Sequence, residues 1–150
     1  MKALSIRRSI KRSAALVFAA LILITAVMLP IEKSKAATTY NNTTTASFYT
    51  SVGTDGVVSV VLSVFGIKSK TTQINTEINV EKKLILGLWL PILIGYPNNV
   101  WTDSVNSFYY SNTFTKQLPS TGTYRVTVTY TVSGSGGAAD VITGSDTVTY

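Results

Sequence analysis

The feature that most constrains this chain is the alternation of apolar and polar side chains at every second residue from position 46 onward. Four segments show it clearly: 58–64, 74–81, 107–114 and 124–132. Successive side chains of a β-strand point to opposite faces, so this period gives each segment one apolar and one polar face. β-branched and aromatic residues dominate the segments, as strands favour. No segment after the first 36 residues has the spacing of an amphipathic helix.

Turn-forming residues separate these segments. Clusters of Gly, Pro, Asn, Asp and Ser lie at 53–56, 66–70, 96–99, 119–122 and 133–137. About seven short strands, each with one apolar face, predict two sheets packed face to face, so we expect an antiparallel β-sandwich over residues 46–150. Its last strand should run from about Val141 to Tyr150 and pair with the strand that begins at Gly122. The expected core includes the following residues: Ile74, Ile78, Val80, Val126, Val128 and Tyr130.

The first 36 residues have the layout of a secretory signal peptide. Five basic residues precede an almost unbroken apolar run from Ala14 to Pro30, and Ser34 and Ala36 provide the small residues of a cleavage site. We expect an N-terminal helix that is cleaved after Ala36 to release a secreted domain. An uncleaved membrane anchor is the alternative, because the apolar run of 17 residues approaches the length of a span. Residues 37–45 are rich in Thr and Asn and predict a flexible leader.

The excess of positive charge belongs to the signal segment. The chain has a formal net charge of +6, but seven of its 13 Lys and Arg residues precede position 37. Six basic and six acidic residues balance each other in the remainder. A neutral domain with a single Arg lacks the charges that neutralise phosphates, so we expect no nucleic-acid partner.

The absence of cysteine and histidine narrows the chemistry further. The chain has neither residue, which excludes disulfides, Cys-zinc sites and the Ser-His-Asp and Cys-His catalytic arrangements. Glu77 and Glu81 form a close acidic pair on the same predicted polar face as Lys83, and a carboxylate hydrolase using them is the most remote alternative. Asp140 and Asp146 lack the alternating spacing of a Ca²⁺ loop. We therefore predict a non-enzymatic domain with no cofactor and no metal.

Residues 84–96 form the most unusual stretch. Ten of these thirteen residues (LILGLWLPILIGY) are Leu, Ile, Trp or Tyr, and none is charged. The stretch is too short to span a bilayer as a helix, and Pro91 would break one. We expect a buried strand followed by a hairpin or crossover. The alternative is an exposed apolar loop that touches a membrane, a partner or another copy of itself. The candidate interaction residues are Leu88, Trp89, Leu90, Ile92, Tyr96 and Trp101.

Residues 118–122 spell Leu-Pro-Ser-Thr-Gly, which is the pattern that sortases recognise. A sorting signal also needs an apolar span and a basic tail after the motif, whereas here alternating residues follow and no basic residue comes after Arg125. The segment is better explained as the turn into a late sandwich strand. We expect Tyr124 to form a tyrosine corner, with its hydroxyl bonded to upstream backbone.

Several segments together resemble a known group of proteins. They are a Gly-Val-Val-Ser-Val-Val-Leu strand, an Ile-x-Val-x-Lys-Lys strand, a Trp-containing middle, and Gly122 to Tyr130 followed by a Gly/Ser turn and a terminal strand. In these features the chain is similar to small secreted proteins of Gram-positive bacteria with a single immunoglobulin-like or fibronectin-III-like sandwich. The resemblance implies that fold for residues 46–150 and supplies no catalytic residues. The chain departs from the group in its long apolar stretch, 84–96.

The sequence therefore predicts a secreted, non-catalytic sandwich that acts as an extracellular binding module or as a structural module of the cell surface. The expected partner is an unidentified extracellular or cell-wall component. We expect membrane contact only through residues 84–96 or an uncleaved signal segment. A membrane-active or self-associating protein using 84–96 is the main alternative.

Overall fold

The computed structural model describes residues 39–95 and 99–150, and the regular elements there are β-strands except for one short turn. The predicted signal helix lies in residues 1–36, outside the described part of the chain. The elements in chain order are β1 Thr43–Val52, β2 Val57–Gly66, β3 Thr71–Lys83, the 3₁₀ turn η1 Ile85–Gly87, β4 Trp89–Pro91, β5 Val100–Val105, β6 Tyr109–Gln117, β7 Thr123–Gly134 and β8 Asp140–Thr149.

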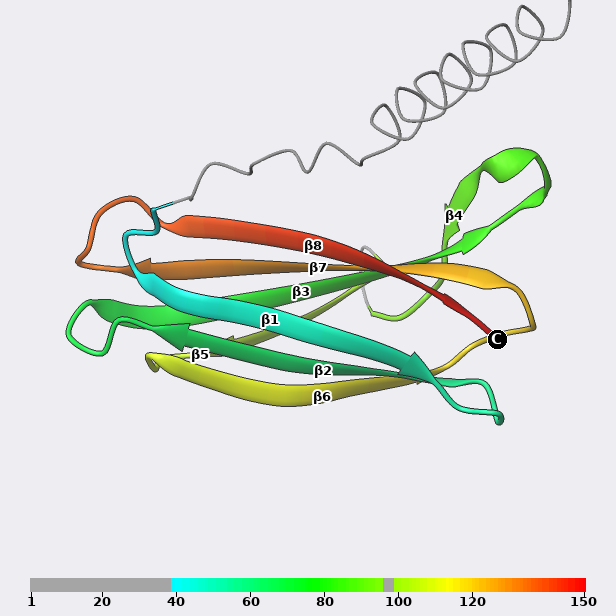
Figure 1. Cartoon of the computed structure of the whole chain (residues 1–150), viewed down its shortest axis with the longest axis horizontal. Coiled ribbons are helices and arrows are strands. Elements are labelled where there is room, and N and C mark those ends of the chain that lie inside the picture. The colour runs from blue at the N-terminus through cyan, green and yellow to red at the C-terminus, as the bar shows by residue number, and fades with distance from the viewer. Residues whose placement is uncertain (1–38, 96–98) are drawn as a thin grey trace, which may run out of the picture. The chain divides into compact units, whose positions relative to one another are not determined.

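The strands form two antiparallel sheets that pack face to face (Figure 1). Sheet A has the order β1-β2-β6, and sheet B has the order β4-β3-β7-β8, with β5 also paired to β3. β1 and β2 form one hairpin, β7 and β8 form another, and the chain crosses between the sheets after β2, β5 and β6. This is the connectivity of an immunoglobulin-like sandwich. The fold expected from the alternation is confirmed, including the pairing of the last strand with β7.

The core lies between the two sheets and is built from alternate residues of the central strands. The side chains from these strands that are buried there are Val58, Val60, Leu62, Val64, Ile74, Ile78, Val80, Tyr124, Val126, Val128, Tyr130 and Val132. All six core residues predicted from the alternation are among them. The Tyr130 hydroxyl donates to the Ser47 carbonyl oxygen at 2.9 Å, which ties β7 to β1 across the sandwich.

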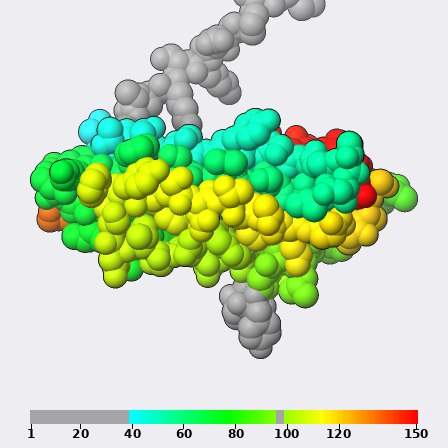
Figure 2. Space-filling view, turned by 90° about the horizontal axis from the view of Figure 1, so that it is seen from below, coloured from blue at the N-terminus to red at the C-terminus, as the bar shows by residue number. Residues whose placement is uncertain are grey.

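Aromatic rings close both open edges of the sandwich. At one edge Phe48 of β1 lies against Gly144 of β8, where an added Cβ would come within 2.6 Å of the ring. At the other edge Trp101 of β5 packs on Phe114 of β6, with ring centroids 5.2 Å apart. The space-filling view shows β5 and β6 side by side along this edge (Figure 2). Trp101 is therefore half-buried and belongs to the packing of the sandwich.

Tyr124 forms the predicted tyrosine corner at the start of β7. Its ring is fully buried, and its hydroxyl donates to the Ser120 carbonyl oxygen at 2.6 Å. Leu118 is buried as well. The Leu-Pro-Ser-Thr-Gly segment is thus the turn that leads into β7, which favours the structural explanation over a sorting signal.

The prediction of a flexible leader over residues 37–45 is wrong at its C-terminal end. β1 already begins at Thr43. The Asp140 carboxylate accepts hydrogen bonds from the Asn41 amide (2.9 Å), the Asn42 amide (2.8 Å) and the Thr43 hydroxyl (2.9 Å). Asn42 is fully buried, and its side-chain oxygen accepts from the Gly136 amide at 2.9 Å. We call Asn41, Asn42, Thr43 and Asp140 the polar clamp. Polar residues can be buried there because their hydrogen bonds are made within the protein.

Candidate functional site

The long apolar stretch lies in a hairpin at one end of sheet B. Residues 81–83 of β3 pair with β4, and residues 84–88 form the turn between them. The Leu84 amide donates to the Leu88 carbonyl at 2.7 Å, and the Gly87 amide donates to the Leu84 carbonyl at 3.1 Å. Figure 1 shows this hairpin standing away from the body of the sandwich. We call residues 84–93 the apolar hairpin.

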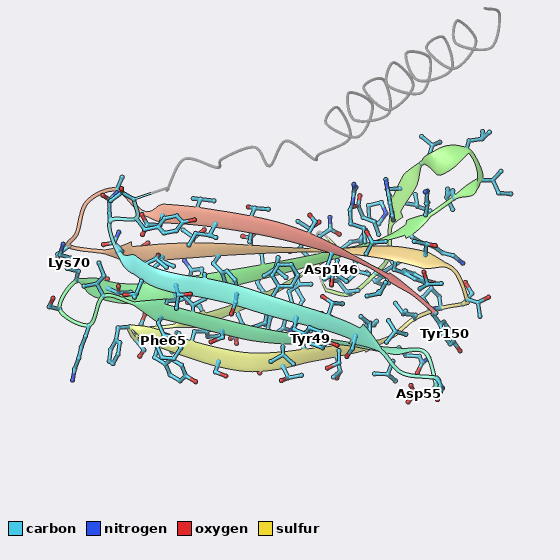
Figure 3. The ribbon with its side chains drawn as sticks, viewed as in Figure 1. Tyr49, Asp55, Phe65, Lys70, Asp146 and Tyr150 are labelled. Atoms are coloured by element: carbon cyan, nitrogen blue, oxygen red, sulfur yellow. The ribbon has the colours of Figure 1, made fainter. Side chains whose placement is uncertain are left out.

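Most side chains of the apolar hairpin are exposed to water. Ile85 and Leu86 at the tip have relative exposures of 91% and 92%, and Leu88 and Leu93 are exposed at 64% and 67%. The side chains in this part of the molecule point outward into open space (Figure 3). The prediction that the stretch forms a buried strand is therefore wrong for most of its length.

The exposure has a simple structural cause. The pairing of β3 with β7 ends at Lys82, opposite Tyr124, so among the described strands only β4 continues beside β3 beyond that point. A two-stranded ribbon buries little surface by itself. The hydrophobic residues of the tip therefore have no packing partner among residues 39–95 and 99–150.

The second arm of the apolar hairpin returns to the sandwich. The Ile92 amide donates to the Val80 carbonyl at 2.9 Å, and the Ile92 side chain is half-buried against the core. Ile94 is buried at 8% exposure. Among the candidate interaction residues, Leu88 and Leu90 are thus exposed, whereas Ile92 contributes to packing. Tyr96 lies outside the described residues.

Trp89 lies at the base of the apolar hairpin, close to two cations. The Arg125 Cζ is 4.6 Å from its ring centroid, and the Lys83 Nζ is 5.8 Å from it. Glu81 holds the guanidinium in place, with its Oε2 at 2.5 Å from Arg125 Nη2 and 2.7 Å from Nε. The four residues share the outer face of sheet B because Trp89 pairs with Lys83 and Glu81 pairs with Arg125. Cation–π contacts therefore fix the half-buried indole.

The opposite face of the hairpin base carries a second lysine. Lys82 pairs with the exposed Leu90, and its Nζ lies 5.8 Å from the Tyr124 ring centroid and 2.5 Å from Ser120 Oγ. The ion pair found in the described part of the chain joins Arg125 and Glu81. Within that part, Lys82 and Lys83 thus have no carboxylate as a partner, and each face of the hairpin base presents a positive charge.

The two glutamates considered for hydrolysis do not share a pocket. Glu77 lines a shallow hollow of about 500 Å³ on the outer face of sheet B, together with Asn75, Thr102 and other polar residues. Glu81 lies outside that hollow and is paired with Arg125. The concave site with both carboxylates that a glutamate-pair hydrolase requires is therefore not formed.

Asp103 is a second acidic residue at this hollow, and no motif in the sequence marks it. Its carboxylate accepts from the Tyr110 hydroxyl at 3.0 Å and from the side-chain Nδ2 of Asn112 at 2.8 Å. Burial acts to raise the pKa of Asp103, but these bonds and one from the Ser104 amide outweigh it and hold the pKa below its ordinary value. For Tyr110, burial and the neighbouring Asp103 raise the pKa to about 12. Both groups therefore serve to join β5 to β6.

Neither a metal-binding cluster nor a membrane-spanning helix is found among the described residues. In residues 39–95 and 99–150, no group of three or more His, Cys, Asp or Glu side chains is placed to hold a metal ion. Asp140 is committed to the polar clamp, and Asp146 is an exposed residue on the same strand. Within the same residues, no helix has the length and apolar character needed to cross a bilayer.

The fold and the hairpin define an immunoglobulin-like sandwich with an exposed apolar extension. Comparison of the chain with protein-family models and with curated proteins finds no match. The role of the apolar hairpin is therefore argued from its own chemistry.

The basic residues around Trp89 were not foreseen as part of this site. The alternation places Arg125 and Lys83 on an outer face of their strands, and this much can be read from the sequence. Their convergence on Trp89 depends on two registers, that of β3 with β7 and that of β3 with β4. The register of β3 with β7 brings together Glu81 and Arg125, which are 44 positions apart, so it has no local signature in the sequence.

Proposed function

We propose that this chain is a secreted, non-catalytic binding module of the bacterial cell envelope, and that the apolar hairpin is its attachment element. The observation that carries the proposal is the exposure of Ile85, Leu86 and Leu88 on a hairpin outside the core. Monomeric soluble proteins rarely expose such a concentration of aliphatic side chains unless it meets a partner. The signal-peptide layout of residues 1–36 supports the extracellular setting.

The energetics are consistent with reversible attachment. A Leu or Ile side chain that moves from water into apolar surroundings contributes roughly 1.5–3 kcal/mol. Four such side chains, Ile85, Leu86, Leu88 and Leu93, would contribute roughly 6–12 kcal/mol. Association itself costs about 4–15 kcal/mol. Aliphatic contact alone therefore supports weak binding, and charged groups near the hairpin are expected to add to it.

A non-catalytic role is supported by the engagement of three acidic residues, Glu81, Asp103 and Asp140, in contacts within the fold. Glu81 is engaged by Arg125, and Asp103 accepts hydrogen bonds from Tyr110 and Asn112. Asp140 is engaged in the polar clamp. Carboxylates committed in this way are suited to holding strands together.

The proposal is tested by sedimentation of the domain, residues 39–150, with a purified envelope fraction of a Gram-positive bacterium. We expect the unmodified domain in the pellet and the double variant Leu86→Ser, Leu88→Ser in the supernatant. The matched control is Val61→Ser with Val141→Ser, which removes exposed apolar side chains elsewhere and should leave sedimentation unchanged. The proposal would be contradicted if all three proteins sedimented to the same extent, or if none of them sedimented with the envelope fraction.

A further inference from the structure

We infer that the partner of the apolar hairpin is the surface of a lipid bilayer that carries anionic headgroups. The inference rests on the proposed function and names the partner of the same site. In the proposed complex the hairpin tip lies among the acyl chains of the bilayer, and the hairpin base lies among the headgroups.

The side chains of the hairpin follow the polarity of a bilayer from tip to base. Ile85 and Leu86 are at the tip, Trp89 comes next, and Lys82 and Lys83 are at the base. Bilayers present the same order, with hydrocarbon inside, an interfacial layer that favours Trp, and a headgroup region that favours Lys. A protein partner would place no such requirement on the order of side chains along a hairpin.

Leu86 is held in a conformation that packing within the domain does not explain. Its φ is 76°, in the left-handed region that favours Gly or Asn, and its side chain is 92% exposed. A large aliphatic residue at such a position is strained, and it buries nothing in return. Strain at an exposed residue points to a function for its side chain, and hydrocarbon contact is what a Leu at a protruding tip can supply.

The turn also limits how deeply the hairpin can enter. Its internal hydrogen bonds are those from Leu84 to Leu88 and from Gly87 to Leu84. Unpaired backbone groups are not tolerated in the hydrocarbon centre, because no water is available to them there. Insertion is therefore shallow: the tip reaches the outer part of the acyl chains of one leaflet, and Trp89 lies in the interfacial layer above them.

The charge of the hairpin base selects anionic lipid. Residues 82–95 contain two lysines and no acidic residue. Neither lysine has a carboxylate partner in the described part of the chain, while the nearby Arg125 is already paired with Glu81. Each basic residue close to an anionic membrane surface favours binding, and salt weakens the effect.

A second copy of the chain is a less suitable occupant. The tip is a convex protrusion, so a copy would need an apolar depression to receive it. The hollow on the outer face of sheet B is lined by Asn75, Thr76, Glu77, Thr102, Asp103, Ser104 and Thr131. These polar side chains offer no receptor for aliphatic residues.

The test uses the fluorescence of Trp89 in vesicles with brominated acyl chains, which quench tryptophan on contact. Residues 39–150 form one compact unit with its own core, so this domain is expected to fold without the preceding segment. The chain has two Trp residues, so Trp101→Phe leaves Trp89 as the single reporter. Vesicles are made of brominated phosphatidylcholine, with or without phosphatidylglycerol, and thermal unfolding verifies that each variant is folded.

We expect strong quenching with the phosphatidylglycerol vesicles and much weaker quenching with phosphatidylcholine alone. Leu86→Ser with Leu88→Ser should lower the apparent affinity by about tenfold or more. Lys83→Glu should remove most of the preference for phosphatidylglycerol, and Val61→Ser with Val141→Ser should change neither measurement. Co-sedimentation of the unsubstituted domain with the same vesicles provides a second readout that does not require Trp101→Phe.

Three results would overturn the inference. The first is an absence of both quenching and co-sedimentation. The second is binding that persists in the double Ser variant. The third is the detection by sedimentation velocity of a dimer that dissociates when the two Ser substitutions are made. If the domain binds the envelope fraction through Leu86 and Leu88 but ignores vesicles, the proposed function stands and the lipid inference fails.

Discussion

The polar clamp is largely buried although its residues are polar, whereas the apolar hairpin is largely exposed although its residues are apolar. The clamp consists of Asn, Thr and Asp residues, yet Asn42 has no exposed surface and Asp140 has 6%. The hairpin consists mainly of Leu and Ile residues, yet Ile85 and Leu86 are more than 90% exposed. The clamp joins β1 to the turn and strand at the other end of the chain, whereas the hairpin extends past the last pairing of β3 with β7.

The difference teaches that available partners decide burial in this domain more than the polarity of the side chain does. Asp140 can be buried because three donors from Asn41, Asn42 and Thr43 replace the water it loses. Leu86 stays exposed because, among the strands that the structure describes, none pairs with the end of the β3–β4 ribbon. The clamp should therefore determine stability, and the hairpin should determine association.

The substitution with the largest expected effect is Asp140→Ala. It removes the acceptor for three hydrogen bonds and leaves the Asn42 amide unpaired in a buried position. We expect the free energy of unfolding to fall by about 3 kcal/mol, measured by urea denaturation. Asp146→Ala is the matched control on the same strand, because Asp146 is exposed, and it should change stability by less than about 0.5 kcal/mol. Equal effects of the two substitutions would show that the clamp carboxylate contributes no more to the free energy of unfolding than an exposed carboxylate does.

A smaller effect is expected from acid. Burial acts to raise the pKa of Asp140, but the hydrogen bonds of the clamp outweigh it and hold the pKa below its ordinary value. The folded state therefore favours the deprotonated carboxylate. Its contribution to stability is complete above the unfolded pKa of about 3.9 and is lost as the pH falls through the lower folded value.

The measurement is the free energy of unfolding as a function of pH between neutrality and strong acid. Stability of the unsubstituted domain should decline below about pH 5, and Asp140→Asn should make the decline less steep. Part of the slope should remain, because the pKa of Asp103 is also lowered in the folded state. An unchanged slope in Asp140→Asn would mean that the pKa of this carboxyl group does not differ between the folded and unfolded states.

The smallest effect is expected at the hairpin tip, where the sign is informative. Leu86→Gly relieves the strain of φ 76° and should raise the free energy of unfolding by up to about 1 kcal/mol. Leu88→Gly is the matched control, since Leu88 has an ordinary φ of −70°. It should lower stability by up to about 1 kcal/mol, because Gly adds freedom to the unfolded chain. Differential scanning calorimetry distinguishes the two signs, and a loss of stability in both variants would argue against strain at Leu86.

The sequence predicted the parts of the fold that depend on local pattern. The alternation placed Val126, Val128 and Tyr130 in the core, and the turn before β7 placed Tyr124 at its corner. The clamp escaped prediction because Asn42 and Asp140 are distant in sequence and meet only when β1 lies beside the β7–β8 turn. The exposure of the hairpin could not be predicted because an apolar run of this length has the same sequence pattern whether or not another sheet covers it.

The tip of the apolar hairpin, residues 84–90, is independent of the core, and this has a consequence for the evolution of the domain. Substitutions at residues 84–90 are not constrained by the fit of side chains between the two sheets, since none of these residues is buried there. New tips of different length or chemistry could replace the present one while the folding of the remainder stays intact. A lineage could thus acquire a different target by drift in a single loop, and the same property makes the hairpin a suitable position for grafting a foreign peptide.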